Sequence, residues 1–190
     1  GNQLTSLDVS NNTALTTLNC SSNPLTSLDV TKNIALTTLI CSCNQLTNLD
    51  VSKNAALTTL NCSDNQLTSL DINATSIVDK WLGHSQTYSI SIGIDRQFDL
   101  SSLPGSFDVS KARNWNGGTV NGTTRTVDDD AAQVTYSYDV GNSKTMDITL
   151  NANFNYCTVT FDSNGGSSVD SQSVIKGGHA TEPETDRKST

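Results

Sequence analysis

Leucines recur at a fixed interval through the first 75 residues of the chain. When this stretch is shifted by 21 positions, leucine falls on leucine, cysteine on cysteine and asparagine on asparagine. The matching columns are Leu4, Leu25, Leu46 and Leu67; Leu7, Leu28, Leu49 and Leu70; Leu15, Leu36 and Leu57; Leu18, Leu39 and Leu60; Val9, Val30, Val51 and Ile72; Cys20, Cys41 and Cys62; and Asn2, Asn23, Asn44 and Asn65. A fixed period of this length predicts a solenoid of stacked coils.

Each repeat contains two short alternating stretches, for example Leu18-Asn19-Cys20 and Leu7-Asp8-Val9. In a strand, alternation turns Leu, Cys and Val toward the interior and leaves Asn19 or Asp8 outside. One repeat cannot bury its own apolar side, but coils stacked about 4.8 Å apart can bury a continuous column. The asparagine column has a separate reason, because an interior amide can hydrogen-bond backbone groups where a coil turns.

These motifs resemble the leucine-rich repeats, and the 21-residue nested form is similar to a bacterial subclass of that family. The resemblance covers about residues 1–77. It implies a curved β-solenoid that serves mainly as a protein-binding scaffold. The chain opens inside a repeat, without an amphipathic cap or an initiating Met, so we expect a fragment of a longer protein.

The pattern changes after Asn73, and the stretch Trp81-Leu82-Gly83-His84 is without an evident counterpart upstream. Short alternating stretches follow, among them Thr87 to Ile92, Val134 to Tyr138 and Thr145 to Phe154. With the Asn121-Gly122 hairpin signal, they predict a small all-β unit over residues 76–155, most simply a sandwich that covers the last repeat. A solenoid end exposes apolar residues and strand edges, so a covering element is physically expected.

Residues 156–190 form a third segment. The stretch Tyr156 to Phe161, the Asn164-Gly165-Gly166 turn and Ser173 to Ile175 predict two strands joined by a turn. This segment resembles the opening half of the Listeria–Bacteroides repeat, which implies a partial β-grasp-like module, and a polar tail follows from Ala180. The predicted fold class is therefore all-β: a leucine-rich repeat solenoid over 1–75, a β-sandwich-like capping and linking unit over 76–155, and a partial β-grasp-like segment at the C-terminus.

Composition narrows the function. Lys and Arg number 11 against 19 Asp and Glu, and the net charge is −8. Phosphate binding needs clustered cations, so nucleic acid is not an expected partner. The chain contains no apolar run near the ~20 residues of a membrane span, so no membrane insertion is expected. No catalytic constellation, metal-ligand spacing or cofactor fingerprint is present in the sequence, so we expect neither enzyme activity nor a cofactor.

Two columns of potentially reactive side chains need an interpretation. Cys20, Cys41 and Cys62 occupy inward strand positions and are interpreted as buried, unbridged thiols that fill space. Outward aspartates stack on another face, where like charges raise one another's pKa. Bound cations, shared protons or neutralisation by nearby hydroxyls and lysines would each relieve the repulsion, and neutralisation is preferred; partner contact is a further alternative. The stacked aspartates are Asp8, Asp29, Asp50 and Asp71.

The sequence is therefore interpreted as a non-enzymatic protein-binding module of a bacterial surface or secreted protein, with a role in adhesion or protein interaction. The alternatives are a structural spacer without its own ligand and a glycan-binding module. Ile40 is the apolar member of an outward, uncharged strand face, and such a residue can anchor a contact. The predicted partner-binding residues are Thr17, Asn19, Thr38, Ile40, Thr59 and Asn61.

Overall fold

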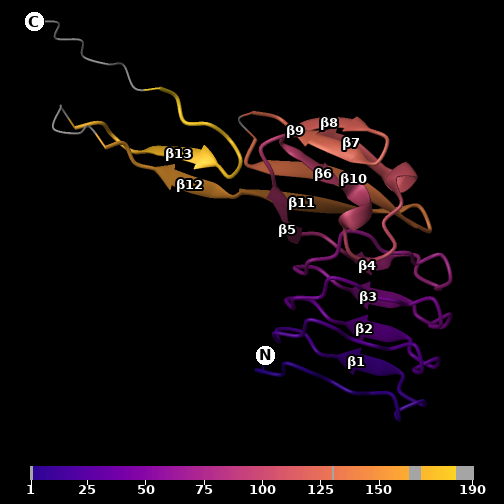
Figure 1. The fold of residues 1–190 in the computed structure, drawn as a ribbon. Coiled ribbons are helices and arrows are strands. Elements are labelled where there is room, and N and C mark those ends of the chain that lie inside the picture. The colour runs from indigo at the N-terminus through magenta and orange to yellow at the C-terminus, as the bar shows by residue number, and fades with distance from the viewer. Residues whose placement is uncertain (1, 130, 163–167, 183–190) are drawn as a thin grey trace, which may run out of the picture.

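The computed structural model describes residues 2–129, 131–162 and 168–182, and the regular secondary structure within them is almost entirely β-strand. Figure 1 shows a stack of coils at the N-terminal end, two sheets above it, and a separate hairpin toward the C-terminus. In these described residues, helix is limited to two single-turn 3-10 segments, Leu100–Ser102 and Val109–Lys111. The predicted all-β class is confirmed.

The stack of coils carries one four-stranded parallel sheet in the order β1-β2-β3-β4. Its register joins residues 21 positions apart, as in Leu18↔Leu39 and Leu39↔Leu60. The period read from the sequence is therefore the distance along the chain between hydrogen-bonded neighbours. The strands are β1 (Thr17–Asn19), β2 (Thr38–Ile40), β3 (Thr59–Asn61) and β4 (Lys80–Leu82).

The aliphatic columns form the core of the stack. Leu25, Leu39 and Leu60 have no exposed surface, and the same holds for most of their column partners. Cys20, Cys41 and Cys62 are buried free thiols in this core, which confirms their predicted inward positions.

Asparagine side chains hold the turns of the coils together. Asn44 Nδ2 donates to the carbonyls of Cys20 and Cys41 at 3.1 and 3.0 Å, and its Oδ1 accepts from the Leu25 N–H at 3.1 Å. Asn65 repeats this arrangement one coil later. In a second column, Asn33 donates to the Val9 and Asn12 carbonyls, and Asn54 repeats these bonds one coil later. The predicted role of interior amides is confirmed, since each one links two adjacent coils.

The parallel pairing continues past residue 75, because β4 pairs with β3 in the same register and sets Trp81 opposite Leu60. The expectation that residues 81–84 lack an upstream counterpart is therefore wrong. Gln86 takes the asparagine position: its Nε2 donates to the Cys62 carbonyl at 2.9 Å, and its Oε1 accepts from the Leu67 N–H at 3.0 Å.

The cysteine column ends at Gly83 for a steric reason. Gly83 lies 21 residues after Cys62, and a Cβ at this position would sit 2.3 Å from Trp81 Cζ2. The indole ring thus occupies the space where a fourth cysteine side chain would point. The ring also donates from Nε1 to the Thr145 carbonyl at 3.2 Å, which ties the fourth coil to the next unit.

Two sheets follow the stack. The larger has the order β5-β11-β10-β7, with β5 parallel to β11 and the other pairs antiparallel, and the smaller is the antiparallel sheet β6-β9-β8. The strands are β5 (Gln86–Ile92), β6 (Gln97–Asp99), β7 (Ala112–Asn116), β8 (Gly118–Asn121), β9 (Thr124–Val127), β10 (Gln133–Gly141) and β11 (Lys144–Phe154).

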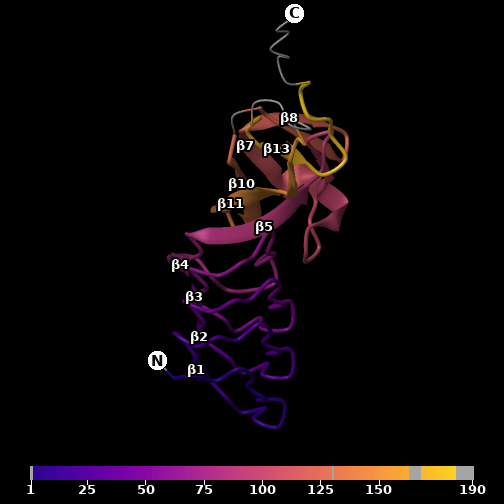
Figure 2. The ribbon, with the colours of Figure 1, turned by 60° about the vertical axis from the view of Figure 1, so that its left-hand side comes forward.

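Buried and exposed residues alternate along β10 and β11, as the sequence pattern predicts. Met146, Ile148 and Leu150 of β11 are buried, and so are the alternate residues Val134, Tyr136, Tyr138 and Val140 of β10. Figure 2 shows β5 crossing directly above β4, so this unit lies against the end of the stack.

The last described element is a hairpin of β12 (Tyr156–Val159) and β13 (Gln172–Ile175), paired antiparallel. The predicted pair of strands is confirmed. The predicted Asn164-Gly165-Gly166 turn and most of the polar tail lie outside the described residues.

Candidate functional site

The outer face of the parallel sheet carries all six predicted partner-binding residues. They flank the inward leucines of β1, β2 and β3 and align in two rows across the strands. The first row contains Thr17, Thr38 and Thr59, and the second contains Asn19, Ile40 and Asn61. We call these six residues, together with Lys80 and Leu82 of β4, the sheet face.

The fourth strand extends this face beyond the prediction. Lys80 pairs with Thr59 and Leu82 with Asn61, so each row gains one member. Leu82 is 49% exposed, whereas Ile40 is half-buried between its neighbours. The main exposed apolar residue of the face is therefore Leu82 rather than Ile40. The sequence could have indicated Leu82, because it stands 21 positions after Asn61, just as Ile40 stands 21 positions after Asn19.

The asparagines of the sheet face are partly committed to their own backbone. Asn19 Oδ1 accepts from the Ser21 N–H at 3.1 Å, and Asn61 Oδ1 accepts from the Ser63 N–H at 3.1 Å. Their amide nitrogens make no hydrogen bond within the described residues and remain available as donors. The face thus offers donors and hydroxyls around two apolar side chains, with one cation at its edge.

The aspartate column lies on another side of the coils, and the structure corrects its expected electrostatics. Each aspartate Oδ1 accepts the N–H two residues later, at 2.8 Å for Asp8 and 2.9 Å for Asp29. These bonds hold the pKa of Asp8 below its usual value, and the Thr31 hydroxyl and N–H do so for Asp29. For Asp8 and Asp29 hydrogen bonding outweighs repulsion, so the expected rise in pKa is wrong for these two carboxylates.

Asp71 differs from the rest of the column because the second unit reaches it. Lys111 Nζ lies 3.2 Å from Asp71 Oδ2, while Asp71 Oδ1 accepts from the Asn73 N–H and side-chain amide at 2.9 Å. The Asn73 N–H is the largest cause of the lowered pKa of Asp71, and Lys111 adds to it. Asp71 is therefore ionised and held in one orientation.

Several further bonds connect the array to the second unit. The buried Tyr136 hydroxyl donates to the Thr68 carbonyl at 2.7 Å, and Thr68 Oγ1 donates to the Pro104 carbonyl at 2.7 Å. The Ile72 N–H donates to the Val140 carbonyl at 2.8 Å. Because these bonds are buried or partly buried, they fix the second unit against the third and fourth coils.

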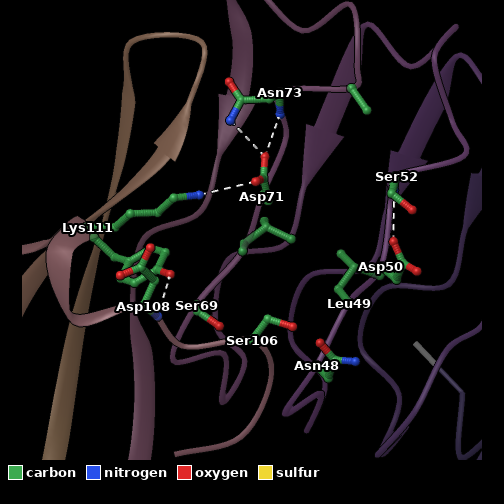
Figure 3. Close-up of a pocket in the computed structure, with 13 residues that line it drawn as sticks. Asn48, Leu49, Asp50, Ser52, Ser69, Asp71, Asn73, Ser106, Asp108 and Lys111 are labelled. Atoms are coloured by element: carbon green, nitrogen blue, oxygen red, sulfur yellow. Dashed lines mark hydrogen bonds and ion pairs between the residues drawn. The ribbon is translucent and has the colours of Figure 1, made fainter. Parts of the chain in front are cut away.

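A hollow of about 560 Å³ opens where the two units meet, and we call it the junction pocket (Figure 3). One wall comes from the third and fourth coils and the other from the loop after Pro104 with Tyr138. Its polar lining consists of Asn48, Asp50, Ser52, Ser69, Asp71, Asn73, Ser106, Asp108, Lys111 and Tyr138. The sequence did not predict this pocket, because its two walls come from segments more than 30 positions apart, such as Asn73 and Ser106.

In the described part of the chain, no group of three or more His, Cys, Asp or Glu side chains is arranged to hold a metal ion. Among the same residues, no helix is long and apolar enough to cross a membrane.

Comparison with known proteins identifies the fold. No protein-family model matches the sequence, and no curated protein matches it. Among solved structures, the chain is similar to the functional domain of InlJ from Listeria monocytogenes, which is described as including a cysteine ladder. The TM-score is 0.58 at 22% sequence identity, over 79% of this chain. The chain spans 36% of the length of that structure. The likeness shows a leucine-rich-repeat-like fold.

Proposed function

We propose that this chain is a non-enzymatic protein-binding module whose sheet face contacts a protein partner. The observation that carries the proposal is the composition of that face: exposed Leu82 and half-buried Ile40 lie among threonine and asparagine side chains. Protein interfaces combine apolar anchors with hydrogen-bonding groups that exclude water around them.

The rigid backbone of the sheet supports the same function. The parallel register and the asparagine bonds between coils hold the rows at fixed spacing. A face built on a fixed scaffold loses little conformational entropy on binding. Partner contact on this face would therefore need few rearrangements.

Within this proposal the three parts of the chain have separate roles. Residues 1–75, extended by the fourth coil, form the binding solenoid, and residues 76–155 form a sandwich-like cap and linker. Residues 156–190 belong to a partial β-grasp-like module that continues a stalk. The bonds of Tyr136 and Trp81 to the array support the capping role, and the similarity of the repeats to bacterial leucine-rich repeats supports a surface or secreted location and a role in adhesion.

Two alternatives compete with protein binding. The threonine row is uniform, as a spacer without a ligand would allow, and its hydroxyls with the asparagine amides also suit a glycan. The placement of Ile40 and Leu82 among hydrogen-bonding side chains favours protein, because protein interfaces combine apolar anchors with polar groups around them.

Site-specific photocrosslinking tests the proposal. A benzoylphenylalanine replaces Ile40 in the full chain, which is then exposed to host and bacterial surface extracts. The matched control carries the same group in place of Ile34, an array residue that is 64% exposed and does not belong to the sheet face. A defined protein adduct from position 40 alone supports the proposal, and its loss on Leu82→Asp locates the contact.

Adducts of equal yield from positions 40 and 34 would contradict a specific sheet-face contact. No adduct from either position, with both variants folded, would favour the spacer. A glycan array with the unmodified chain distinguishes the second alternative, since glycan binding that Ile40→Asp abolishes would move the ligand class from protein to carbohydrate.

A further inference from the structure

The junction pocket contains a polar group that the fold leaves without a partner. Ser69 is 6% exposed and lines the pocket, and its hydroxyl makes no hydrogen bond within the described residues. The loop at Gly105 closes over it, since a Cβ there would sit 2.7 Å from Ser69 Oγ. Figure 3 shows Ser69 and Ser106 among the side chains that line the pocket, one from the array and one from the second unit. Ser69 Oγ is not fully enclosed by protein atoms, so on the side of the pocket it can meet a ligand atom.

Besides the Ser69 hydroxyl, one carboxylate oxygen each of Asp50 and Asp108 is free to accept a hydrogen bond. Asp108 uses Oδ1 for the Ser110 N–H and hydroxyl at 2.9 and 2.7 Å, and Asp50 uses Oδ1 for the Ser52 N–H at 2.9 Å. Their Oδ2 atoms have no hydrogen-bond partner among the described residues. The pocket is therefore lined by acceptors that the protein itself leaves free.

The charge of the lining selects a cation. Asp50, Asp71 and Asp108 stand against one ammonium, Lys111, which is already paired with Asp71. The Ser110 hydroxyl lowers the pKa of Asp108 and the Asn73 N–H lowers that of Asp71, so both are ionised at neutral pH. An anionic group would meet an excess of negative charge, and the described residues offer no three-carboxylate cage for a metal ion.

We propose that the junction pocket binds an arginine guanidinium from the surface of the partner protein. The inference rests on the proposed function and names the chemistry that the partner presents. A guanidinium carries five N–H donors in a planar fork, which can serve several separate acceptors at once, whereas an ammonium is a compact point charge. The volume also fits, because about 560 Å³ holds a side chain together with several waters at roughly 30 Å³ each.

The pocket also places this contact at a single position along the array. Lys111, Asp108 and Ser106 come from the second unit, so no other pair of coils can reproduce the lining. Asp29 occupies the same column as Asp50 but is absent from the lining, which makes it a matched control for general acidic attraction.

The test is an NMR titration of the full ¹⁵N-labelled chain with the blocked peptide acetyl-Gly-Arg-Gly-amide. We expect saturable shifts of the Asn48, Ser69 and Ser106 amides, with weak, roughly millimolar affinity for one exposed contact. The citrulline peptide, which has the same shape without the charge, should leave these amides unmoved. Asp108→Asn should weaken binding about two- to fivefold, the range of an exposed ion pair, while Asp29→Asn should leave it unchanged.

Three results would overturn the inference: equal shifts with the citrulline peptide, equal losses from Asp29→Asn and Asp108→Asn, or equal affinity for the matching lysine peptide. Ser69→Ala, which removes the open hydroxyl without adding volume, should weaken arginine binding, and unchanged affinity there would also count against it. The two proposals fail separately, because the peptide titration needs no partner and the crosslinking at position 40 does not involve the pocket.

Discussion

Replacing Asn44 by alanine tests the bonding that holds adjacent coils together. Asn44 is 8% exposed, donates to the Cys20, Cys41 and Ser42 carbonyls, and accepts from the Leu25 N–H. Alanine removes all of these bonds and leaves the N–H of fully buried Leu25 without a partner.

The cost follows from the number and burial of these groups. A typical hydrogen bond contributes about 1 kcal/mol, and a buried group left unsatisfied costs roughly 1–3 kcal/mol. Two lost amide donors and one orphaned N–H therefore predict a loss of about 3–5 kcal/mol in the free energy of unfolding. Domains are stable by only about 5–15 kcal/mol, so Asn44→Ala should remove a large fraction of the total.

Urea unfolding followed by circular dichroism measures this loss, provided that the denaturant dependence stays the same in parent and variant. The matched control is Asn11→Ala, because Asn11 belongs to the same array but is exposed and makes no side-chain hydrogen bond within the described residues. It should stay within about 0.5 kcal/mol of the parent. Amide exchange of Leu25 should accelerate in Asn44→Ala alone. A loss below about 1 kcal/mol for Asn44→Ala would refute the proposed role of the interior amides.

Leu39→Ala should cost about 2–5 kcal/mol in urea unfolding, because Leu39 is fully buried between two coils; parent-like stability would contradict the register. Gly83→Ala should displace the Trp81 ring and shift its fluorescence, whereas an unchanged spectrum and melting temperature would contradict the steric account. Burial raises the pKa of Cys62 to about 12, so the thiol loses its proton at lower pH in the unfolded chain than in the folded one. The free energy of unfolding should therefore fall from about pH 8.5 toward 12. Cys62→Ala should reduce that fall, and the same pH dependence in parent and variant would contradict the role of Cys62. Millimolar calcium should leave the melting temperature unchanged, because no group of side chains in the described residues is arranged to hold a metal ion. A calcium site at 100 times its dissociation constant would stabilise the fold by about 2.7 kcal/mol, so a rise in melting temperature that Asp50→Asn abolishes would reveal such a site.

The repeat array could be predicted from sequence because each structural demand repeats every 21 residues. The columns of Leu39 and Cys41 point inward in successive coils for the same reason, so they are visible without coordinates. The fourth coil was missed because its columns change together: Trp81 stands for leucine, Gly83 for cysteine and Gln86 for asparagine. These replacements occur where the last coil meets the second unit: the Trp81 ring fills the space beside Gly83 and bonds the Thr145 carbonyl. A single sequence does not show that contact.

The junction pocket lay beyond sequence analysis for a different reason. Its two walls come from segments with no shared pattern, and their proximity depends on bonds such as Tyr136 to the Thr68 carbonyl, 68 residues apart. Asp108 and Lys111 were not singled out in the sequence, since they follow no column. Such a site becomes visible only when the second unit is placed against the array.

The near-identity of the coils has a consequence for binding. A partner that contacted only the threonine row would find Thr17, Thr38 and Thr59 equivalent, so it could bind in registers displaced by one coil with similar free energy. Specificity requires a difference in affinity between such registers. Ile40 and Leu82 break the equivalence on the sheet face, and the junction pocket breaks it at one end. Leu82 of β4 and the junction pocket both belong to the end of the array that meets the second unit, on different sides of the coils, so either contact alone would fix the register of a partner at that end.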